Sequence, residues 1–259
     1  MIRPNPHVAP RAALVTGGAR RVGLAITRAL VDAGYAVAVH ANSSHAEAEA
    51  ICADIRKQGG RAQAVQADLN DHMQVLKLVP SAVAALGPLT LLVNNASMFE
   101  SDDIATLSRE LFDRHVAIHV RAPLFLAQAF AAQAPDDAGA SIVNILDQRV
   151  LKPTPLFLSY ALSKNGLHTA TTMLAQALAP RIRVNGVAPG PTLPSRRQSP
   201  EEFARQAANL PLGHATTPDE VAQAVLFLAA AASVTGQIIA VDGGQHLAWQ
   251  TPDVAGITE

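Results

Sequence analysis

The chain has 259 residues, of which 49% are hydrophobic and only 4% aromatic, and its formal net charge is −1. This length fits one α/β domain with a full core, and no linker-like stretch divides it. The balanced charge and the absence of long basic runs argue against nucleic acid or an anionic membrane as partners. The single cysteine, Cys52, excludes an internal disulfide and predicts a buried thiol in a reducing compartment, and no zinc-ligand spacing is present.

The two ends of the chain differ from the part between them. Residues 1–11 hold three prolines and no apolar core, so they predict a loose arm rather than a signal peptide or an anchor. No apolar run reaches the roughly 20 residues that span a bilayer. We therefore expect a cytoplasmic protein with no membrane partner, one domain over residues 12–247 and a tail over residues 248–259.

Short apolar runs alternate with longer runs of helical periodicity through the domain. Strands are expected at residues 12–16, 36–40, 62–67, 89–94, 141–146, 182–188 and 237–243. Helices are expected at residues 26–34, 45–58, 72–86, 110–130, 159–178 and 219–231. This alternation predicts a single-domain α/β fold with a doubly wound parallel sheet and helices on both faces.

A glycine-rich turn separates the first strand from a helix that begins near Leu24. It reads Thr-Gly-Gly-Ala-Arg-Arg-Val-Gly over residues 16–23. Glycines allow the backbone to approach a pyrophosphate at a helix N-terminus. The spacing departs from Gly-x-Gly-x-x-Gly, so the glycines alone fit a plain tight turn equally well. Arg20 and Arg21 favour the phosphate interpretation, because guanidinium groups suit a phosphate better than a core.

The end of the second strand indicates which nicotinamide cofactor binds. Residues 42–44 read Asn-Ser-Ser and contain no acid, which would hold the ribose hydroxyls of NAD and repel a 2′-phosphate. Together with Arg20 and Arg21, this segment predicts NADP. Asp68, at the end of the third strand, is expected to accept a hydrogen bond from the adenine amino group. The alternative for Asp68 is an N-cap of the following helix.

Small polar residues follow the fourth strand, at Asn94, Asn95, Ala96 and Ser97. Such residues at the carboxyl end of a strand fit a backbone that lies against a ligand. Phe99 lies just beyond them, and a ring facing the ligand and a core residue are equally good interpretations of it.

Tyr160 and Lys164 are four residues apart in a helical run, so both side chains should project from the same helix face. An ammonium beside a phenol stabilises the phenolate and lowers its pKa from about 10. Asp147 follows the fifth strand, at the edge where open α/β sheets place their chemistry. The alternative for Asp147 is a salt bridge with Arg149 or Lys152.

Residues 191–210 are polar and contain three prolines. They predict a mobile substrate flap and a short helix that begins after Ser199. Arg196 and Arg197 in this segment either contact substrate or form a solvated pair.

Four motifs, the turn over residues 16–23, Asn94-Asn95-Ala96, Tyr160-x-x-x-Lys164 and Pro189-Gly190, together resemble those of the short-chain dehydrogenase/reductases. The resemblance covers about residues 12–247 and implies a Rossmann fold and a homotetramer or homodimer. It also implies that the tyrosine is the general acid and that the lysine lowers its pKa and holds the nicotinamide ribose. The family has a serine 13 positions before the tyrosine, where this chain has Asp147.

Departures from the common pattern are similar to the pteridine reductase branch of that family. They are Asp147, Arg21 in place of the middle glycine, Ser97 and Phe99. His119, where most members have a structural asparagine, and residues 242–247 resemble the bacterial dihydromonapterin reductases. A histidine that supports the lysine and a merely buried, satisfied histidine both remain open for His119.

This resemblance implies NADPH-dependent reduction of a dihydropterin, such as dihydromonapterin or dihydrobiopterin, with weak action on dihydrofolate. Phe99 would stack on the pterin, Arg21 and Ser97 would bind its pyrimidine edge, and Asp147 with Tyr160 would deliver a proton. Reduction of a ketone or 3-oxoacyl thioester is the first alternative. A non-catalytic NADP-binding sensor is the second.

The residues expected to bind NADP are Gly17, Arg20, Arg21, Val22, Asn42, Ser43, Ser44, Asp68, Leu69, Asn95, Ala96, Ser97, Tyr160, Lys164, Pro189 and Gly190. Those expected to bind substrate are Arg21, Ser97, Phe99, Asp147 and Tyr160, and those expected to act in catalysis are Asp147, Tyr160 and Lys164.

Overall fold

A seven-stranded parallel sheet forms the centre of the computed structural model, which describes residues 11–136, 139–195 and 197–250. Its strand order is β3-β2-β1-β4-β5-β6-β7, with every neighbouring pair parallel. The strands are β1 (Ala12–Val15), β2 (Ala36–Ala41), β3 (Ala62–Gln66), β4 (Leu91–Asn94), β5 (Ser141–Ile145), β6 (Arg183–Pro189) and β7 (Ile238–Val241). All seven strands expected from the sequence are confirmed.

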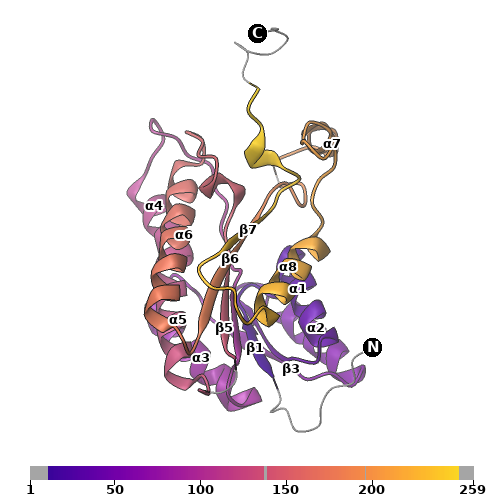
Figure 1. The fold of residues 1–259 in the computed structure, drawn as a ribbon, viewed down its shortest axis with the longest axis vertical. Helices are drawn as coiled ribbons and strands as arrows, with labels where there is room; N and C mark the ends of the chain where they lie inside the picture. The colour runs from indigo at the N-terminus through magenta and orange to yellow at the C-terminus, as the bar shows by residue number, and fades with distance from the viewer. Residues whose placement is uncertain (1–10, 137–138, 196, 251–259) are drawn as a thin grey trace.

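Helices cover both faces of this sheet, as the doubly wound class requires (Figure 1). One face carries α3 (His72–Leu86), α4 (Arg109–Val116), α5 (Ala122–Gln133) and α6 (Leu158–Leu178). The other carries α1 (Arg21–Asp32), α2 (His45–Lys57) and α8 (Pro218–Ala230). The short helix α7 (Pro200–Ala208) stands beyond the carboxyl ends of the strands. Among the described helices, none combines the length and hydropathy needed to cross a membrane.

The central strands β1, β2, β4 and β5 are buried along their whole length because helices cover both faces of the sheet. Leu14 of β1 packs in one cluster with Leu78 of α3 and Phe130 of α5. Its neighbour Val15 points the other way, into a cluster with Ile26 of α1 and Val225 of α8. Successive strand residues face opposite sides of the sheet, so one strand contributes side chains to both hydrophobic clusters. The predicted burial of Cys52 in the second cluster is also confirmed.

The strand order reverses between β1 and β4, and ligands of open α/β sheets bind at the carboxyl ends of the strands beside such a reversal. The loops that follow β1, β2, β4, β5 and β6 all leave the sheet at this edge. They carry most of the residues that the sequence assigns to the site.

The helix expected over residues 110–130 is interrupted. It consists of α4, a π-helical segment η1 (Ala117–Arg121) and α5. A π turn accommodates one extra residue, which apolar periodicity does not register. His119 lies in this segment with 1% of its surface exposed.

Helix α1 begins at Arg21, three residues earlier than Leu24, where the sequence placed its start. The first three helical residues add no clear apolar period, so the pattern could not show the true start. Arg21 has a φ of 51°, in the left-handed region. For a residue other than glycine this conformation costs roughly 1–2 kcal/mol.

Helix α7 begins at Pro200, and Ser199 caps it through a capping box with Glu202, so the predicted start after Ser199 is confirmed. Two short 3-10 helices, η2 (Gln148–Val150) and η3 (Gln245–Leu247), were not expected. Residues 1–10 of the expected arm, Arg196 and residues 251–259 of the expected tail lie outside the described part of the chain.

Candidate active site

Two adjoining cavities open at the carboxyl edge of the sheet. The first, of about 690 Å³, is lined by all sixteen residues that the sequence assigns to the cofactor. The second, of about 770 Å³, is lined by all five residues assigned to the substrate. Both volumes lie in the range of small-molecule sites. The cavities share Arg21, Ser97, Phe99, Asp147 and Tyr160, so a ligand in one borders a ligand in the other.

The glycine turn is built for close backbone approach. A Cβ added to Gly23 would lie 2.0 Å from the carbonyl oxygen of Gly17, so only glycine fits there. Gly17 has a φ of 63°, which also favours glycine. The Asn95 side-chain amide donates to the carbonyls of Thr16 (2.9 Å) and Gly17 (3.1 Å). Asn95 therefore lines the cofactor cavity by holding the turn against the end of β4.

His40 supports the turn from beneath, a role that the sequence did not reveal. The Gly17 amide donates to His40 Nδ1 at 3.1 Å, so Nε2 carries the proton and donates to the Ala67 carbonyl at 3.0 Å. Burial lowers the pKa of His40 to about 4 and keeps its ring neutral. The sequence did contain a signal for this role, because His40 is a polar residue near the end of an apolar strand, two residues before the polar segment 42–44.

Acidification from about pH 7.5 to 5 is expected to lower the free energy of unfolding. His40 titrates near 6.5 when unfolded and near 4 when folded, so its contribution is complete above about pH 6.5 and is lost toward pH 4. Its maximal share is about 3 kcal/mol. Urea titrations across this pH range should show the decrease in the free energy of unfolding, and His40→Asn should make this free energy depend less on pH. The same substitution at exposed His214 is the control; an undiminished slope in His40→Asn would contradict the assignment.

The two arginines of the turn have different hydrogen-bond partners. The Arg20 guanidinium pairs with the Glu47 carboxylate of α2, with Nε to Oε2 at 2.8 Å. Arg21 donates to the carbonyls of Leu193 (3.2 Å) and Pro194 (3.1 Å), across the substrate cavity. Both line the cofactor cavity as expected, but the sequence did not show that Glu47 neutralises Arg20.

Asp68 also lines the cofactor cavity, and the alternative that it caps a helix is wrong. Its carboxylate accepts from the backbone and side-chain amides of Asn70, both at 2.9 Å. Asp71 caps α3 instead, accepting from the amides of Met73 and Gln74. Two acidic residues three positions apart made the choice ambiguous in sequence.

Tyr160, Asp147 and Lys164 come together at the boundary of the two cavities. The Tyr160 phenol donates to Asp147 Oδ2 at 2.9 Å. Lys164, 2% exposed, donates from Nζ to the Ile145 carbonyl at 2.7 Å and lies 5.8 Å from the Tyr160 ring centroid. Helix α6 carries the tyrosine and lysine, and the end of β5 carries the aspartate.

The expected lowering of the Tyr160 pKa is wrong for this structure. Burial, the Asp147 charge and the hydrogen bond to Asp147 hold the pKa of Tyr160 well above 10. Burial lowers the pKa of Lys164 to about 8, against the opposing pull of Asp147. The sequence argument counted only the lysine, because the depth of the phenol and its contact with Asp147 arise from packing.

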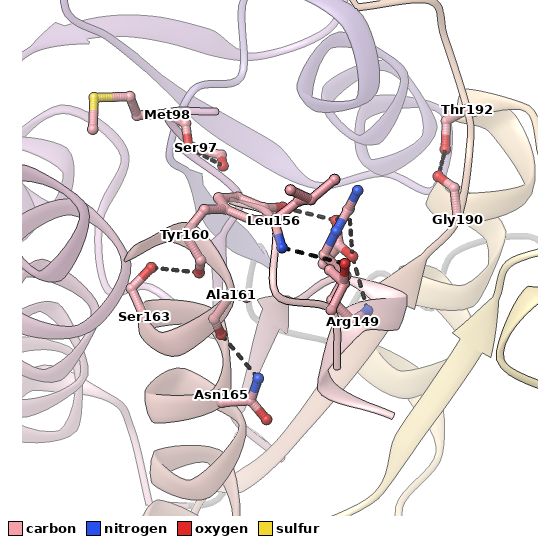
Figure 2. Close-up of polar contacts among 12 residues, drawn as sticks. Ser97, Met98, Arg149, Leu156, Tyr160, Ala161, Ser163, Asn165, Gly190 and Thr192 are labelled. Atoms are coloured by element: carbon pink, nitrogen blue, oxygen red, sulfur yellow. Dashed lines mark hydrogen bonds and ion pairs between the residues drawn. The ribbon is translucent and has the colours of Figure 1, made fainter. Parts of the chain in front are cut away.

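Asp147 also takes part in the salt bridge left open as an alternative. Arg149 Nη1 lies 3.2 Å from both carboxylate oxygens, and the Arg149 amide donates to Oδ1 at 2.9 Å. Lys152 donates instead to the Ala248 carbonyl. The carboxylate therefore contacts the Tyr160 phenol and the Arg149 guanidinium at once, and these two residues, which Figure 2 labels, both line the substrate cavity.

An aromatic cluster forms another wall. Phe99 stacks on Phe157 with centroids 4.4 Å apart and meets Tyr160 edge-on at 4.8 Å. The guanidinium carbons of Arg149 and Arg197 each lie 5.4 Å from the Phe99 centroid. Arg197 also pairs with Glu100 and donates to the Phe99 carbonyl, so it is not merely solvated. Phe157 was missed; its signal was an aromatic residue in the loop before Tyr160.

Asp102 is another residue that sequence reasoning missed. It is 3% exposed, and its carboxylate accepts from the Ser159 amide at 3.1 Å and from the Ser159 hydroxyl. Its carbonyl accepts from the amides of Phe157 (2.8 Å) and Leu158 (3.3 Å). Phe157 has a φ of 58°, and these bonds fix that left-handed turn at the start of α6. Asp102 thus sets the position of both Phe157 and Tyr160.

Comparison with known proteins agrees with this architecture. A family described as enoyl-(acyl carrier protein) reductase matches residues 17–246. An uncharacterized oxidoreductase of Methylorubrum extorquens is 37% identical, over 90% of this chain and 97% of the relative. A putative ketoacyl reductase of the granaticin polyketide synthase from Streptomyces violaceoruber is 32% identical, over 91% and 96%.

A solved structure is more similar. FolM alternative dihydrofolate reductase 1 from Brucella canis, complexed with NADP, is 52% identical and covers 96% of this chain and 98% of its own, with a TM-score of 0.93. With its Rossmann fold and the match over residues 17–246, the chain belongs to the short-chain dehydrogenase/reductase family of oxidoreductases.

Proposed function

We propose that this protein is an NADPH-dependent reductase that converts a dihydropterin to the tetrahydropterin. The single observation that carries the proposal is the hydrogen bond from Tyr160 to Asp147 at the wall of a cavity that also holds Phe99. Dihydromonapterin and dihydrobiopterin are the substrates of first choice, with weak action on dihydrofolate. The similar protein from Brucella canis supports both the cofactor and the substrate class.

The cofactor cavity fits a dinucleotide. Gly17 and Gly23 let the turn pack tightly at the start of α1, where free amides and the helix dipole favour an anion such as a pyrophosphate. No acid follows β2, which favours NADP over NAD. NADPH, when bound, supplies the hydride. Tyr160 lines both cavities, and Lys164 lines the cofactor cavity beside it, where the nicotinamide would meet the substrate.

The chemistry of a carbon–nitrogen double bond suits these residues. When the carbon accepts hydride, the nitrogen gains an electron pair and becomes strongly basic. Tyr160 keeps its proton at neutral pH because its pKa is raised, and it passes that proton to the nitrogen. The phenolate left behind faces Asp147, whose charge opposes it and drives its reprotonation from solvent. The nearby Lys164 ammonium stabilises the transient Tyr160 phenolate by its positive charge.

Carbonyl reduction suits Asp147 less well. A serine at this position would donate a hydrogen bond to a carbonyl oxygen, whereas an ionised aspartate is an acceptor only. Its negative charge would also repel a developing alkoxide. Phe99 and Phe157 offer flat faces, against which a planar bicyclic ring packs better than a flexible acyl chain.

Steady-state assays test the proposal directly. NADPH oxidation is followed with dihydromonapterin, dihydrobiopterin and dihydrofolate, and in parallel with a panel of ketones and 3-oxoacyl thioesters. We expect the highest kcat/KM for an unconjugated dihydropterin. Protein that oxidises NADPH with a ketone but turns over no pterin would refute the proposal.

Carbonyl reduction is the second candidate. It is favoured by the likeness to the putative ketoacyl reductase from Streptomyces violaceoruber. In that case the same panel would give its highest kcat/KM with a 3-oxoacyl thioester, and Tyr160 would protonate an oxygen rather than a nitrogen.

Arg20→Ala is expected to raise the dissociation constant of NADPH about 10- to 100-fold, the loss of one charge-assisted hydrogen bond, and to change that of NADH little. Glu47→Gln is the matched variant, because it releases Arg20 and removes a negative charge near the 2′-phosphate. It should tighten NADPH severalfold. Fluorescence titration of each protein with NADPH and with NADH measures these dissociation constants, and equal binding of NADPH and NADH by the unmodified protein would contradict the assignment.

The value of kcat/KM for NADPH is expected to fall above about pH 8, where the Lys164 ammonium loses its proton. Below that pH the charge is present and holds the ribose; above it the charge is absent, so the profile falls on its alkaline side. Lys164→Arg, whose guanidinium stays charged, should retain activity to higher pH than the unmodified protein, although at a lower level. A flat profile to about pH 9.5 would contradict this role.

The proposal includes a homotetramer or homodimer in the cytoplasm. Helix α6 supports the assembly, because it presents Leu162 and Met173 at 52% and 62% exposure on its outer side. Light scattering in solution measures the oligomeric state.

The proposal also includes residues 191–210 as a flap over the substrate, which Arg21 contacts through the carbonyls of Leu193 and Pro194.

A further inference from the structure

His119 lies between the loop that follows β4 and helix α6. Its Nε2 lies 2.9 Å from the Ser97 hydroxyl and 3.2 Å from the Met98 amide nitrogen. Its Nδ1 lies 2.8 Å from the Ser163 hydroxyl, which in turn donates to the Tyr160 carbonyl at 2.8 Å (Figure 2). One buried ring therefore joins the substrate loop to the turn of α6 that carries the tyrosine.

These partners fix the direction of every hydrogen bond. The Met98 amide can only donate, so Nε2 is an acceptor without a proton. Burial, together with the charges of Lys164 and His115, lowers the pKa of His119 well below 6.5, so the ring is neutral and its proton is on Nδ1. Nδ1 donates to Ser163, which leaves the Ser163 proton for the Tyr160 carbonyl.

This arrangement fixes the direction in which the Ser97 hydroxyl donates its hydrogen bond. Its hydroxyl proton points at His119 Nε2, because that nitrogen offers a lone pair at 2.9 Å, whereas the Met98 carbonyl is 3.4 Å away. Ser97 is exposed and lines both cavities, so its oxygen lone pairs remain available to a ligand there. The loop therefore presents a hydrogen-bond acceptor, two residues before Phe99.

Lys164 is not a partner of His119. Its Nζ donates to the Ile145 carbonyl, and no hydrogen bond joins it to His119 among the described residues. The direct hydrogen-bond partners of His119 are therefore the Ser97–Met98 loop and Ser163. His119 is more than a satisfied core residue. Its Nε2 contacts Ser97 and Met98, which line the cofactor cavity. Its Nδ1 contacts Ser163, which donates to the Tyr160 carbonyl.

We propose that His119 is a positioning residue for substrate selectivity: it makes Ser97 an obligatory acceptor and fixes the spacing between the Ser97–Phe99 loop and Tyr160. This inference rests on the proposed function and goes beyond it by naming the substrate edge that is selected. An acceptor at Ser97 pairs with an N–H edge, such as the amino-pyrimidine edge of a pterin. It gives no such bond to a ligand that offers only carbonyl oxygens.

Two amide variants test the roles of the two His119 ring nitrogens separately. The Gln amide overlays Nε2 of histidine, and the Asn amide overlays Nδ1. His119→Gln keeps an acceptor for Met98 and Ser97 and should leave KM for the dihydropterin within about threefold. His119→Asn loses both bonds and should raise that KM about tenfold or more, with kcat and KM for NADPH changed less than threefold. Equal effects of the two variants would overturn the proposal.

A double-mutant cycle and a spectrum complete the test. In a Ser97→Ala background, His119→Asn should raise the pterin KM much less than in the unmodified protein, whereas independent effects would overturn the coupling. In ¹⁵N-histidine NMR spectra, His119 should be the Nδ1–H tautomer at neutral pH, and an Nε2–H tautomer would overturn the proposal whatever the substrate. Failure of the proposed function is distinguishable, because the unmodified protein would then turn over no dihydropterin.

Discussion

Replacement of Tyr160 by phenylalanine is expected to lower kcat for a dihydropterin about 10²- to 10⁴-fold, the range that a positioned general acid contributes. The phenol is the proton donor with a raised pKa in the wall that the two cavities share. The ring itself is retained, so its edge-on contact with Phe99 survives. Stopped-flow measurement of a single turnover at saturating NADPH isolates this step.

The control for Tyr160→Phe is cofactor binding. Because the variant removes only a hydroxyl, the dissociation constant of NADPH should stay within about threefold of the unmodified value. A variant that binds NADPH normally and still reduces the dihydropterin at more than a tenth of the original rate would exclude Tyr160 as the acid.

Replacement of Asp147 by serine is expected to shift selectivity. It should lower kcat/KM for a dihydropterin about 10²-fold or more, since it removes the group that holds the Tyr160 proton. It should also raise kcat/KM for a simple ketone, because a serine hydroxyl donates to a carbonyl oxygen and the repulsive charge is gone. The tyrosine should titrate at lower pH in this variant.

Asp147→Asn is the isosteric control, because it keeps the size of the side chain and removes its charge. It should lose pterin reduction to a similar extent without the gain on ketones that a hydroxyl provides. Retention of pterin turnover within about twofold in both variants would show that Asp147 serves only its salt bridge with Arg149.

The elements of the sheet follow from sequence because their cause is local. The strands β1, β2, β4 and β5 are short, mostly apolar runs buried along their whole length, and a glycine, asparagine or aspartate lies within two residues of each carboxyl end. The same-face placement of Tyr160 and Lys164 follows from helical spacing alone. The location of Asn95, Ser97 and Asp147 at one edge follows from the parallel order of the strands.

Other features depend on packing between distant segments, which no local pattern records. The Arg20–Glu47 pair joins residues 27 positions apart, and the Asp102–Ser159 contact joins residues 57 apart. The pKa of Tyr160 depends on its burial and on Asp147, and the sequence argument had weighed only Lys164. The π turn at His119 changes the helix by one residue, which periodicity averages away.

Transfer of deuterium from 4-deuterated NADPH tests the central claim most directly. The protein, the labelled cofactor and a dihydropterin are mixed in equal amounts, and the product is analysed by mass spectrometry. The account predicts a tetrahydropterin with one deuterium on carbon, formed faster than any labelled alcohol from a ketone panel. Rapid labelling of an alcohol with no labelled tetrahydropterin would contradict it.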